Sequence, residues 1–200
     1  MKIAGKTIGF AITGSYCTHA KTLPIVTQFV QNGAKVIPIL SENVAITDTR
    51  FGRAEDLIDQ LFKATGYNPI TSINGAEPIG PKEMLDALVI APCTGNTLAK
   101  MANGVTDTSV TMAAKAHIRN NRPVIIAIST NDGLGNSCKN IGALLNMKNI
   151  YFVPFGQDDP INKNNSLVAH FDYILQSTEK ALDSSQIQPI VKEYVSDAIV

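Results

Sequence analysis

The amino-acid sequence predicts a single three-layer α/β/α domain built on a parallel sheet. Strand-like and helix-like segments alternate from one end of the chain to the other, as in proteins whose parallel strands are joined by helices. The strand-like segments are nearly continuous apolar runs, which are typical of strands covered on both faces. The chain has 200 residues, 44% of them hydrophobic, so it has the length of one domain and enough apolar residues for a core. We assign residues 1–187 to this domain and residues 188–200 to a C-terminal tail.

The first half of the chain contains three strand-like and two helix-like segments. Short runs of β-branched and apolar residues predict strands at 6–12, 34–40 and 69–73. Apolar residues at helical spacing predict helices over 20–31 and 53–65. Gly33 follows the first of these helices, at a position where glycine commonly ends a helix.

The second half continues the alternation with three strands and four helices. The strands are predicted at 87–91, 123–129 and 150–154, and we expect Pro92 to end the first of them. The helices are predicted at 94–102, 109–119, 140–148 and 165–182. Because no linker or repeat interrupts this pattern, it indicates one Rossmann/flavodoxin-like sheet.

The composition excludes several classes of protein. Lys plus Arg and Asp plus Glu both number 17, which excludes a general nucleic-acid binder and a polybasic membrane-surface protein. Charged residues make up only 17%, below the roughly 25% of an average domain, and such a surface favours a homo-oligomer. The N-terminus lacks the apolar segment of a signal peptide, and the longest apolar run, 124–128, is far below the ~20 residues of a membrane span. We therefore expect a cytoplasmic protein that does not contact membranes.

The cysteines and histidines do not predict a disulfide framework or a metal site. Cys17, Cys93 and Cys138 are widely separated and odd in number. Cys17 and His19 lie two residues apart, but no third metal ligand is close to them in the sequence. Cys93 follows a predicted strand, where it is either a reactive thiol or a small buried hydrophobic residue.

Four loops follow the predicted strands, at 13–18, 41–51, 92–97 and 129–135. In parallel α/β sheets, ligands bind beyond the carboxyl ends of the strands, at the point where the strand order reverses. We therefore expect these four loops to form the binding site together.

The first two loops are suited to a single phosphate. Gly14 and Ser15 lie at a strand-to-helix turn, with Thr13 and Thr18 beside them, so backbone N–H groups and hydroxyls could bind an anion there. Ser15 occupies the position of the P-loop lysine, and no G-x-G-x-x-G is present, which argues against a triphosphate or a dinucleotide. Ser41 would add a hydroxyl to the same site. The alternatives are that Ser15 only caps a helix and that Ser41 is only a turn residue.

The third and fourth loops supply amide and hydroxyl groups. Residues 92–97 read Pro-Cys-Thr-Gly-Asn-Thr, a set that could hydrogen-bond the polar edge of a flat heterocycle, with Thr94 or Asn96 capping the next helix. Asn131 could orient a carboxylate or an amide. The alternative for Asn131-Asp132-Gly133 is an ordinary tight turn.

These residues resemble a known family. The ordered set Gly14-Ser15, then residues 91–97, then Lys100, Asn103-Gly104 and Asp107, is similar to the homo-oligomeric flavin-containing cysteine decarboxylases, over roughly residues 6–182. The resemblance implies a flavoprotein domain that binds FMN and assembles as a trimer-based homo-oligomer. The cofactor-binding residues that it and the loops predict are Thr13, Gly14, Ser15, Thr18, Ser41, Pro92, Thr94, Gly95, Asn96, Thr97 and Ser129.

Four further stretches, 49–52, 75–82, 129–132 and 151–158, are similar to one subgroup of that family. Its members are the B subunits of a two-subunit sporulation enzyme. The resemblance implies that an NADP-linked A subunit pairs with this chain in the mother-cell cytoplasm and that the two oxidise dihydrodipicolinate to pyridine-2,6-dicarboxylate. Asn131 and Arg50 would then bind the dicarboxylate, since a guanidinium fork suits a carboxylate. The alternative for Arg50 is an ordinary solvent-exposed side chain.

Two departures from the family pattern concern the reaction. Pro78 stands where the decarboxylases have a catalytic histidine, and the Pro-Ala-Met-Asn segment survives only as residues 128–131, which keep the asparagine. No catalytic residue is therefore identified. Two alternatives stay open: a non-catalytic stabilising subunit with an empty flavin site, and a stand-alone FMN-dependent decarboxylase or prenyltransferase.

Overall fold

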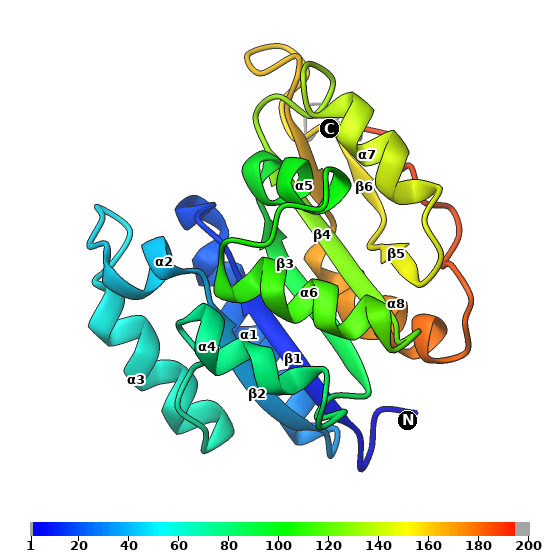
Figure 1. Cartoon of the computed structure of the whole chain (residues 1–200). Helices are drawn as coiled ribbons and strands as arrows, with labels where there is room; N and C mark the ends of the chain where they lie inside the picture. Colours follow the sequence, from blue (N-terminus) through cyan, green and yellow to red (C-terminus); the bar gives the residue numbers. More distant parts are fainter. Residues whose placement is uncertain (1, 195–200) are drawn as a thin grey trace.

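The computed structural model describes residues 2–194, and within them seven strands form one sheet (Figure 1). Five of the strands run parallel in the order β2-β1-β3-β4-β5. They are β1 (Thr7–Ile12), β2 (Lys35–Leu40), β3 (Ala87–Cys93), β4 (Val124–Thr130) and β5 (Ile150–Phe152). This is the flavodoxin-like strand order, whose switch point lies between β1 and β3. The predicted fold class is confirmed.

Helices cover both faces of the sheet and complete the three layers (Figure 1). On one face lie α1 (His19–Gln31) and α8 (Ile174–Leu182). On the other lie α5 (Gly95–Ala102), α6 (Ser109–Arg119) and α7 (Cys138–Leu145), while α3 (Ala54–Thr65) packs on α1 and β2. Among the described residues, no helix combines the length and the apolar character that crossing a membrane requires.

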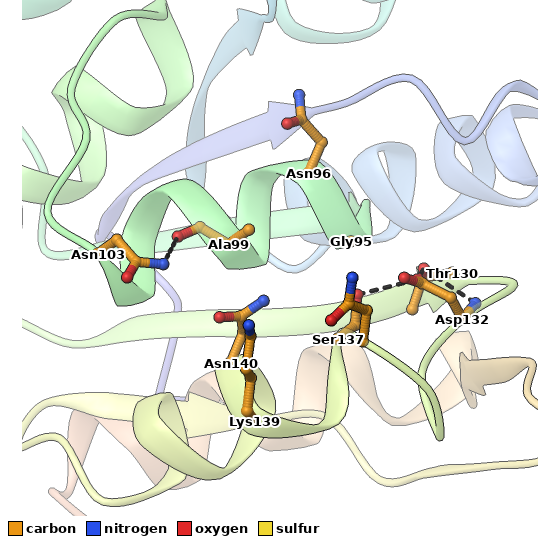
Figure 2. A pocket seen from close by; sticks show the side chains of 10 residues that line it. Gly95, Asn96, Ala99, Asn103, Thr130, Asp132, Ser137, Lys139 and Asn140 are labelled. Carbon is orange, nitrogen blue, oxygen red and sulfur yellow. Dashed lines mark hydrogen bonds between the residues drawn. The ribbon is translucent and has the colours of Figure 1, made fainter.

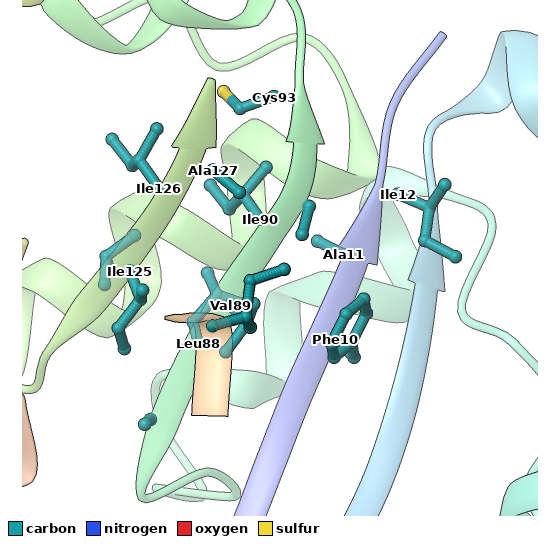
Figure 3. Packing of buried hydrophobic residues seen from close by; sticks show 14 of the residues in the cluster. Phe10, Ala11, Ile12, Leu88, Val89, Ile90, Cys93, Ile125, Ile126 and Ala127 are labelled. Carbon is teal, nitrogen blue, oxygen red and sulfur yellow. The ribbon is translucent and has the colours of Figure 1, made fainter. Parts of the chain in front are cut away.

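The core consists mainly of the parallel strands themselves. All seven residues of β3 are buried, as are five of six in β1 and six of seven in β4. Figure 3 shows Phe10 of β1, Val89 of β3 and Ile125 of β4 in this cluster. Burial on both faces explains why these strands are continuous apolar runs in the sequence. The loops at their carboxyl ends are consequently held on a rigid base.

The prediction of a helix over 165–182 is wrong in its first part. Residues 167–169 form strand β7 (Leu167–Ala169), which pairs antiparallel with β4 at Ser129 and Thr130 and with β6 (Phe155–Gly156). Strand β5 pairs parallel with β4 and ends opposite Ile126. Beyond Ile126, this edge of β4 is therefore open, and β7 can pair with it. Leu167 and Ala169 are buried around the less buried Val168, which is the alternation of a strand and not of a helix.

Two further predictions about strands are wrong. Residues 69–73 make only one isolated bridge, Ile39 to Ile70, and helix α4 (Ile73–Ala76) begins there because the Ser72 side chain caps it. Pro92 does not end β3, which continues to Cys93 with a shift of register against β4. The Pro92 carbonyl connects the ends of β3 and β1, because it accepts hydrogen bonds from both the backbone N–H and the hydroxyl of Thr13.

Several short elements were not predicted. They are α2 (Glu42–Ile46) and the single 3₁₀ turns η1 (Tyr16–Thr18), η2 (Glu77–Ile79) and η3 (Phe171–Tyr173). In the segment predicted as a tail, Ile190 and Lys192 exchange backbone hydrogen bonds with Phe155, and residues 195–200 lie outside the described residues. The domain boundary at residue 187 stays a prediction.

Candidate functional site

A cavity of ≈ 410 Å³ lies at the carboxyl ends of β1 and β3, where the strand order reverses. We call it the switch-point cavity. The structure brings five of the predicted cofactor-binding residues together in its lining: Gly14, Ser41, Thr94, Asn96 and Thr97. These residues come from three of the four predicted loops, while the fourth loop, 129–135, contributes no residue to this lining.

Gly14 leaves open space in the cavity wall. The three atoms nearest to a Cβ at this position would all belong to the Tyr16 side chain, at 3.5–3.9 Å, which is ordinary van der Waals contact. The packing of the chain therefore does not require a glycine here, whereas the close approach of a ligand to the backbone would. Nearby, Ser41 precedes α2 but does not use its hydroxyl to cap that helix, so this group is available to a ligand.

The first turn of α5 forms another wall of the cavity. The Thr94 hydroxyl accepts a hydrogen bond from the Thr97 backbone N–H (3.3 Å) and lies 3.1 Å from the Thr97 hydroxyl. Of the two residues predicted to cap this helix, Thr94 and Asn96, Thr94 is thus the N-cap of α5. The positive end of the helix dipole also lies at this turn, and it favours an anion or an electron-rich ring edge nearby.

The cavity contains three charged groups, of which two form an ion pair. The Lys100 ammonium lies 2.9 Å from an Asp107 carboxylate oxygen. One carboxylate oxygen of Glu42 accepts from the Ser109 backbone N–H (2.8 Å), while the other is buried without a hydrogen-bond partner among the described residues. Binding of an anion would consequently depend on backbone N–H groups, hydroxyls and the α5 dipole, and not on an unpaired lysine.

The other predicted cofactor-binding residues lie behind the cavity wall and connect the loops. Buried Thr13 donates to the Pro92 carbonyl (2.8 Å) and accepts from the Thr94 N–H (3.0 Å). Thr18 donates to the Ser15 carbonyl (2.7 Å), and the Ser15 hydroxyl lies 2.7 Å from that of Ser129. Ser15 does not cap the following turn with its side chain. Direct contact of these residues with a cofactor stays a prediction.

Gly95 faces a second cavity, also of ≈ 410 Å³, between α5 and α7 (Figure 2). A Cβ on Gly95 would lie 2.7 Å from the hydroxyls of Thr130 and Ser137. Those hydroxyls donate to the Asp132 carboxylate (2.6 and 2.9 Å), and the bond from Thr130 is the main reason that the pKa of Asp132 is lowered. Asn96 lines both cavities, so the two flank the first turn of α5.

The predicted substrate-binding residues lie outside both cavities. Asn131 is exposed in a turn, the backbone conformation that its alternative interpretation predicted. Arg50 is exposed, with its guanidinium carbon 4.8 Å from the centre of the Phe51 ring. A role for either residue in substrate binding stays a prediction.

The interpretation of Cys93 as a reactive thiol is not supported by its surroundings. The side chain is fully buried in β3, and burial raises the pKa of its thiol far above the usual range. Since the thiolate is the reactive form, Cys93 behaves as a small hydrophobic residue. Residues that sequence reasoning missed include Tyr16 and Asn43, which line the switch-point cavity. Their position within the predicted loops was the only signal that could have identified them.

Comparisons with known proteins agree with this architecture. The family model described as flavoprotein matches residues 1–179. The B subunit of dipicolinate synthase from Bacillus subtilis (strain 168) is 51% identical over 191 residues, which cover 96% of each chain. The crystal structure of the dipicolinate synthase B subunit from Bacillus halodurans C has a TM-score of 0.90 at 47% identity, covering 98% of this chain and 100% of that one. Burkholderia xenovorans DmrB in complex with FMN has the same fold, with a TM-score of 0.65 at 17% identity over 90% of this chain and 96% of that one.

Proposed function

The chain belongs to the flavoprotein family, and from this premise we propose that it is the B subunit of a dipicolinate synthase and binds FMN in the switch-point cavity. The observation that carries the proposal is the convergence of Gly14, Ser41 and the capped first turn of α5 on one cavity at the β1/β3 switch point. Flavodoxin-like folds place FMN at this switch point.

The residues of the cavity fit an FMN molecule. Its phosphate would lie against the Gly14 backbone and the Ser41 hydroxyl, with Thr13, Ser15, Thr18 and Ser129 holding the surrounding loops. Its ring system would lie against the segment that contains Pro92, Thr94, Gly95, Asn96 and Thr97. A bound flavin supplies the capacity to accept and donate a hydride.

The reaction in this proposal is the oxidation of dihydrodipicolinate to dipicolinate together with the NADP-linked A subunit of dipicolinate synthase. The dihydropyridine loses a hydride and a proton, and NADP⁺ on the partner becomes NADPH. The part of this chain is to orient the dicarboxylate. The sequence predicts Asn131 and Arg50 for this role, but neither of them lines the switch-point cavity or the cavity between α5 and α7. The name of the relative, which is 51% identical, supports the subunit role, and it leads us to propose a place in sporulation, in the mother-cell cytoplasm. A trimer-based homo-oligomer is part of the same proposal.

A second candidate is a non-catalytic subunit whose flavin site is empty. The Glu42 carboxylate in the cavity favours it, because no lysine or arginine pairs with Glu42 among the described residues, whereas Asp107 is paired with Lys100, and an unpaired carboxylate opposes the binding of a phosphate. The presence of Pro78, in place of the histidine of the decarboxylases, likewise favours it and argues against a stand-alone decarboxylase. Decarboxylation of a peptide with a C-terminal cysteine by this chain alone would support the interpretation as a stand-alone decarboxylase.

The two candidates differ in the visible absorption spectrum of the purified protein, before and after addition of FMN, with acid release to identify the chromophore. Our proposal predicts one released FMN per chain. A colourless protein that does not bind added FMN would contradict it and favour the non-catalytic role. A second experiment compares the synthase activity of the isolated A subunit with that of the A subunit mixed with this chain. Full turnover by the A subunit alone would exclude a catalytic role for this chain.

A further inference from the structure

The second cavity, between α5 and α7, has the character of a built binding site that the flavin does not explain. We call it the amide cavity, because asparagines 96, 103, 136 and 140 contribute to its lining. Its volume of ≈ 410 Å³ is in the range of small-molecule sites. It adjoins the switch-point cavity at Asn96, so a ligand in it would be next to a ligand in the other.

Asn140 is the residue that points to a ligand. Its side chain is only 8% exposed, and its amide points into the amide cavity toward α5 (Figure 2). Among the described residues, no side-chain hydrogen bond involves this amide, and Figure 2 draws none to the other lining residues. The residue is held in place by burial while its amide borders the cavity, so both the amide N–H₂ and its oxygen can hydrogen-bond a ligand there.

The neighbouring charges determine what that group is. Lys139 precedes Asn140 on α7, is exposed to the cavity, and forms no ion pair within residues 2–194. In Figure 2, Ser137 lies between Lys139 and Asn140 on one side and Asp132 on the other. The Asp132 carboxylate is bound by Thr130 and Ser137 at its own end. An ammonium beside an amide N–H₂ is a donor set suited to a carboxylate.

We propose that Lys139 and Asn140 bind one carboxylate of the substrate in the amide cavity. The inference rests on the proposed function for the identity of that substrate, a pyridine-type dicarboxylate. The carboxylate would lie at the Lys139 end, away from Asp132, whose charge excludes a second carboxylate from the opposite end.

The test is the binding of pyridine-2,6-dicarboxylate to the full chain, measured by calorimetry with and without FMN. Lys139→Met and Asn140→Asp should each weaken binding by ~10-fold or more, since each removes or opposes a charge-assisted hydrogen bond. Lys148→Met is the matched control, because Lys148 is also exposed, follows α7, and lies outside the cavity. This control should leave the affinity unchanged, and FMN binding should be unchanged in all three variants.

Three results with the variants or with a competitor would overturn the inference. They are an unchanged dicarboxylate affinity in both Lys139→Met and Asn140→Asp, an equal loss in Lys148→Met, and equally effective competition by inorganic phosphate. A wild-type protein that binds FMN but not the dicarboxylate would also overturn it while leaving the flavin site intact. Failure of the proposed function is a different result: it appears as absence of bound FMN in the wild-type protein, whatever the dicarboxylate affinity.

Discussion

The hydroxyl groups of Ser15 and Ser129 lie 2.7 Å apart, although 114 residues separate them in the sequence. The contact joins the loop after β1 to the end of β4, across the end of β3. Thr13 makes the same kind of connection between β1 and β3 through the Pro92 carbonyl. Three of the four loops beyond the sheet are consequently one hydrogen-bonded unit, which holds the switch-point cavity in shape.

Removing either hydroxyl of this pair should destabilise the fold. Ser15→Ala and Ser129→Ala should each lower the free energy of unfolding by about 1 kcal/mol, as expected for loss of one part-buried hydrogen bond. The double variant should lose clearly less than the sum, because both changes remove the same contact. Denaturant unfolding of the four proteins measures this cycle. Fully additive losses would show that the two hydroxyls do not stabilise the fold through a shared contact. Weakened FMN binding at unchanged stability would instead indicate that the hydroxyls act on the ligand.

Gly14→Asp should abolish flavin binding without unfolding the protein. The Cβ has space beside the Tyr16 ring, and Gly14 does not have a positive φ, so the stability should change by no more than about 0.5 kcal/mol. The new carboxylate would occupy and repel the phosphate position. Acid-released FMN per chain and a thermal unfolding curve are the measurements.

Gly14→Asn is the matched control for that substitution, because its side chain is nearly the same size and uncharged. It should retain more FMN than the aspartate variant. Normal flavin content in Gly14→Asp would contradict the proposed position of the phosphate.

Much of the fold was predictable because buried parallel strands are recognisable from local sequence. Residues 87–91 and 124–128 are uninterrupted apolar runs, and both lie in central strands. The segment 165–169 was not predictable in this way, since its strand exists only because β4 leaves an edge unpaired beyond Ile126. Such tertiary pairing overrides the local preference for a helix.

The site was predictable only where it depends on the ends of strands. Gly14, Ser41 and Thr94 follow β1, β2 and β3, so the topology alone brings them together. Lys139 and Asn140 carry no such signal, because they lie on a helix whose orientation toward α5 is set by packing. Likewise, the sequence cannot tell a serine that lines a cavity, such as Ser41, from one that joins two loops, such as Ser15.

Gly95→Ala should be destabilising because α5 approaches the Thr130 and Ser137 hydroxyls too closely for a side chain. The added Cβ would lie 2.7 Å from both oxygens, so α5 or the turn must move, at a cost of about 1–3 kcal/mol. Gly142→Ala, within α7, is the control: its Cβ would meet nothing within 4 Å, and alanine should stabilise that helix by about 1 kcal/mol. Chemical denaturation of both variants tests whether the free energy of unfolding falls in Gly95→Ala and rises in Gly142→Ala. Equal effects at the two positions would refute the packing argument.

His117 should make the fold sensitive to mild acid. The side chain is buried in α6 with Nε2 unpartnered among the described residues. Burial, followed by the charge of Arg122, lowers its pKa from 6.5 to about 4, against weaker opposing effects of the Pro123 backbone and Asp86. Since the unfolded chain takes up this proton at a higher pH than the folded protein, stability is fully present above pH 6.5 and declines as the pH falls toward about 4.

The size of that decline and its origin are both measurable. The shift corresponds to ~3 kcal/mol for His117 across this window, and His19 and His170, whose pKa values burial also lowers, act in the same direction. Urea unfolding of wild type and of His117→Gln at intervals from pH 7 to pH 4 should give the variant a much flatter profile. His170→Gln, at an exposed position, should keep most of the wild-type slope. Equal slopes in His117→Gln and wild type would mean that the acid sensitivity arises from other groups, because the imidazole would then have the same proton affinity in the folded and unfolded chains.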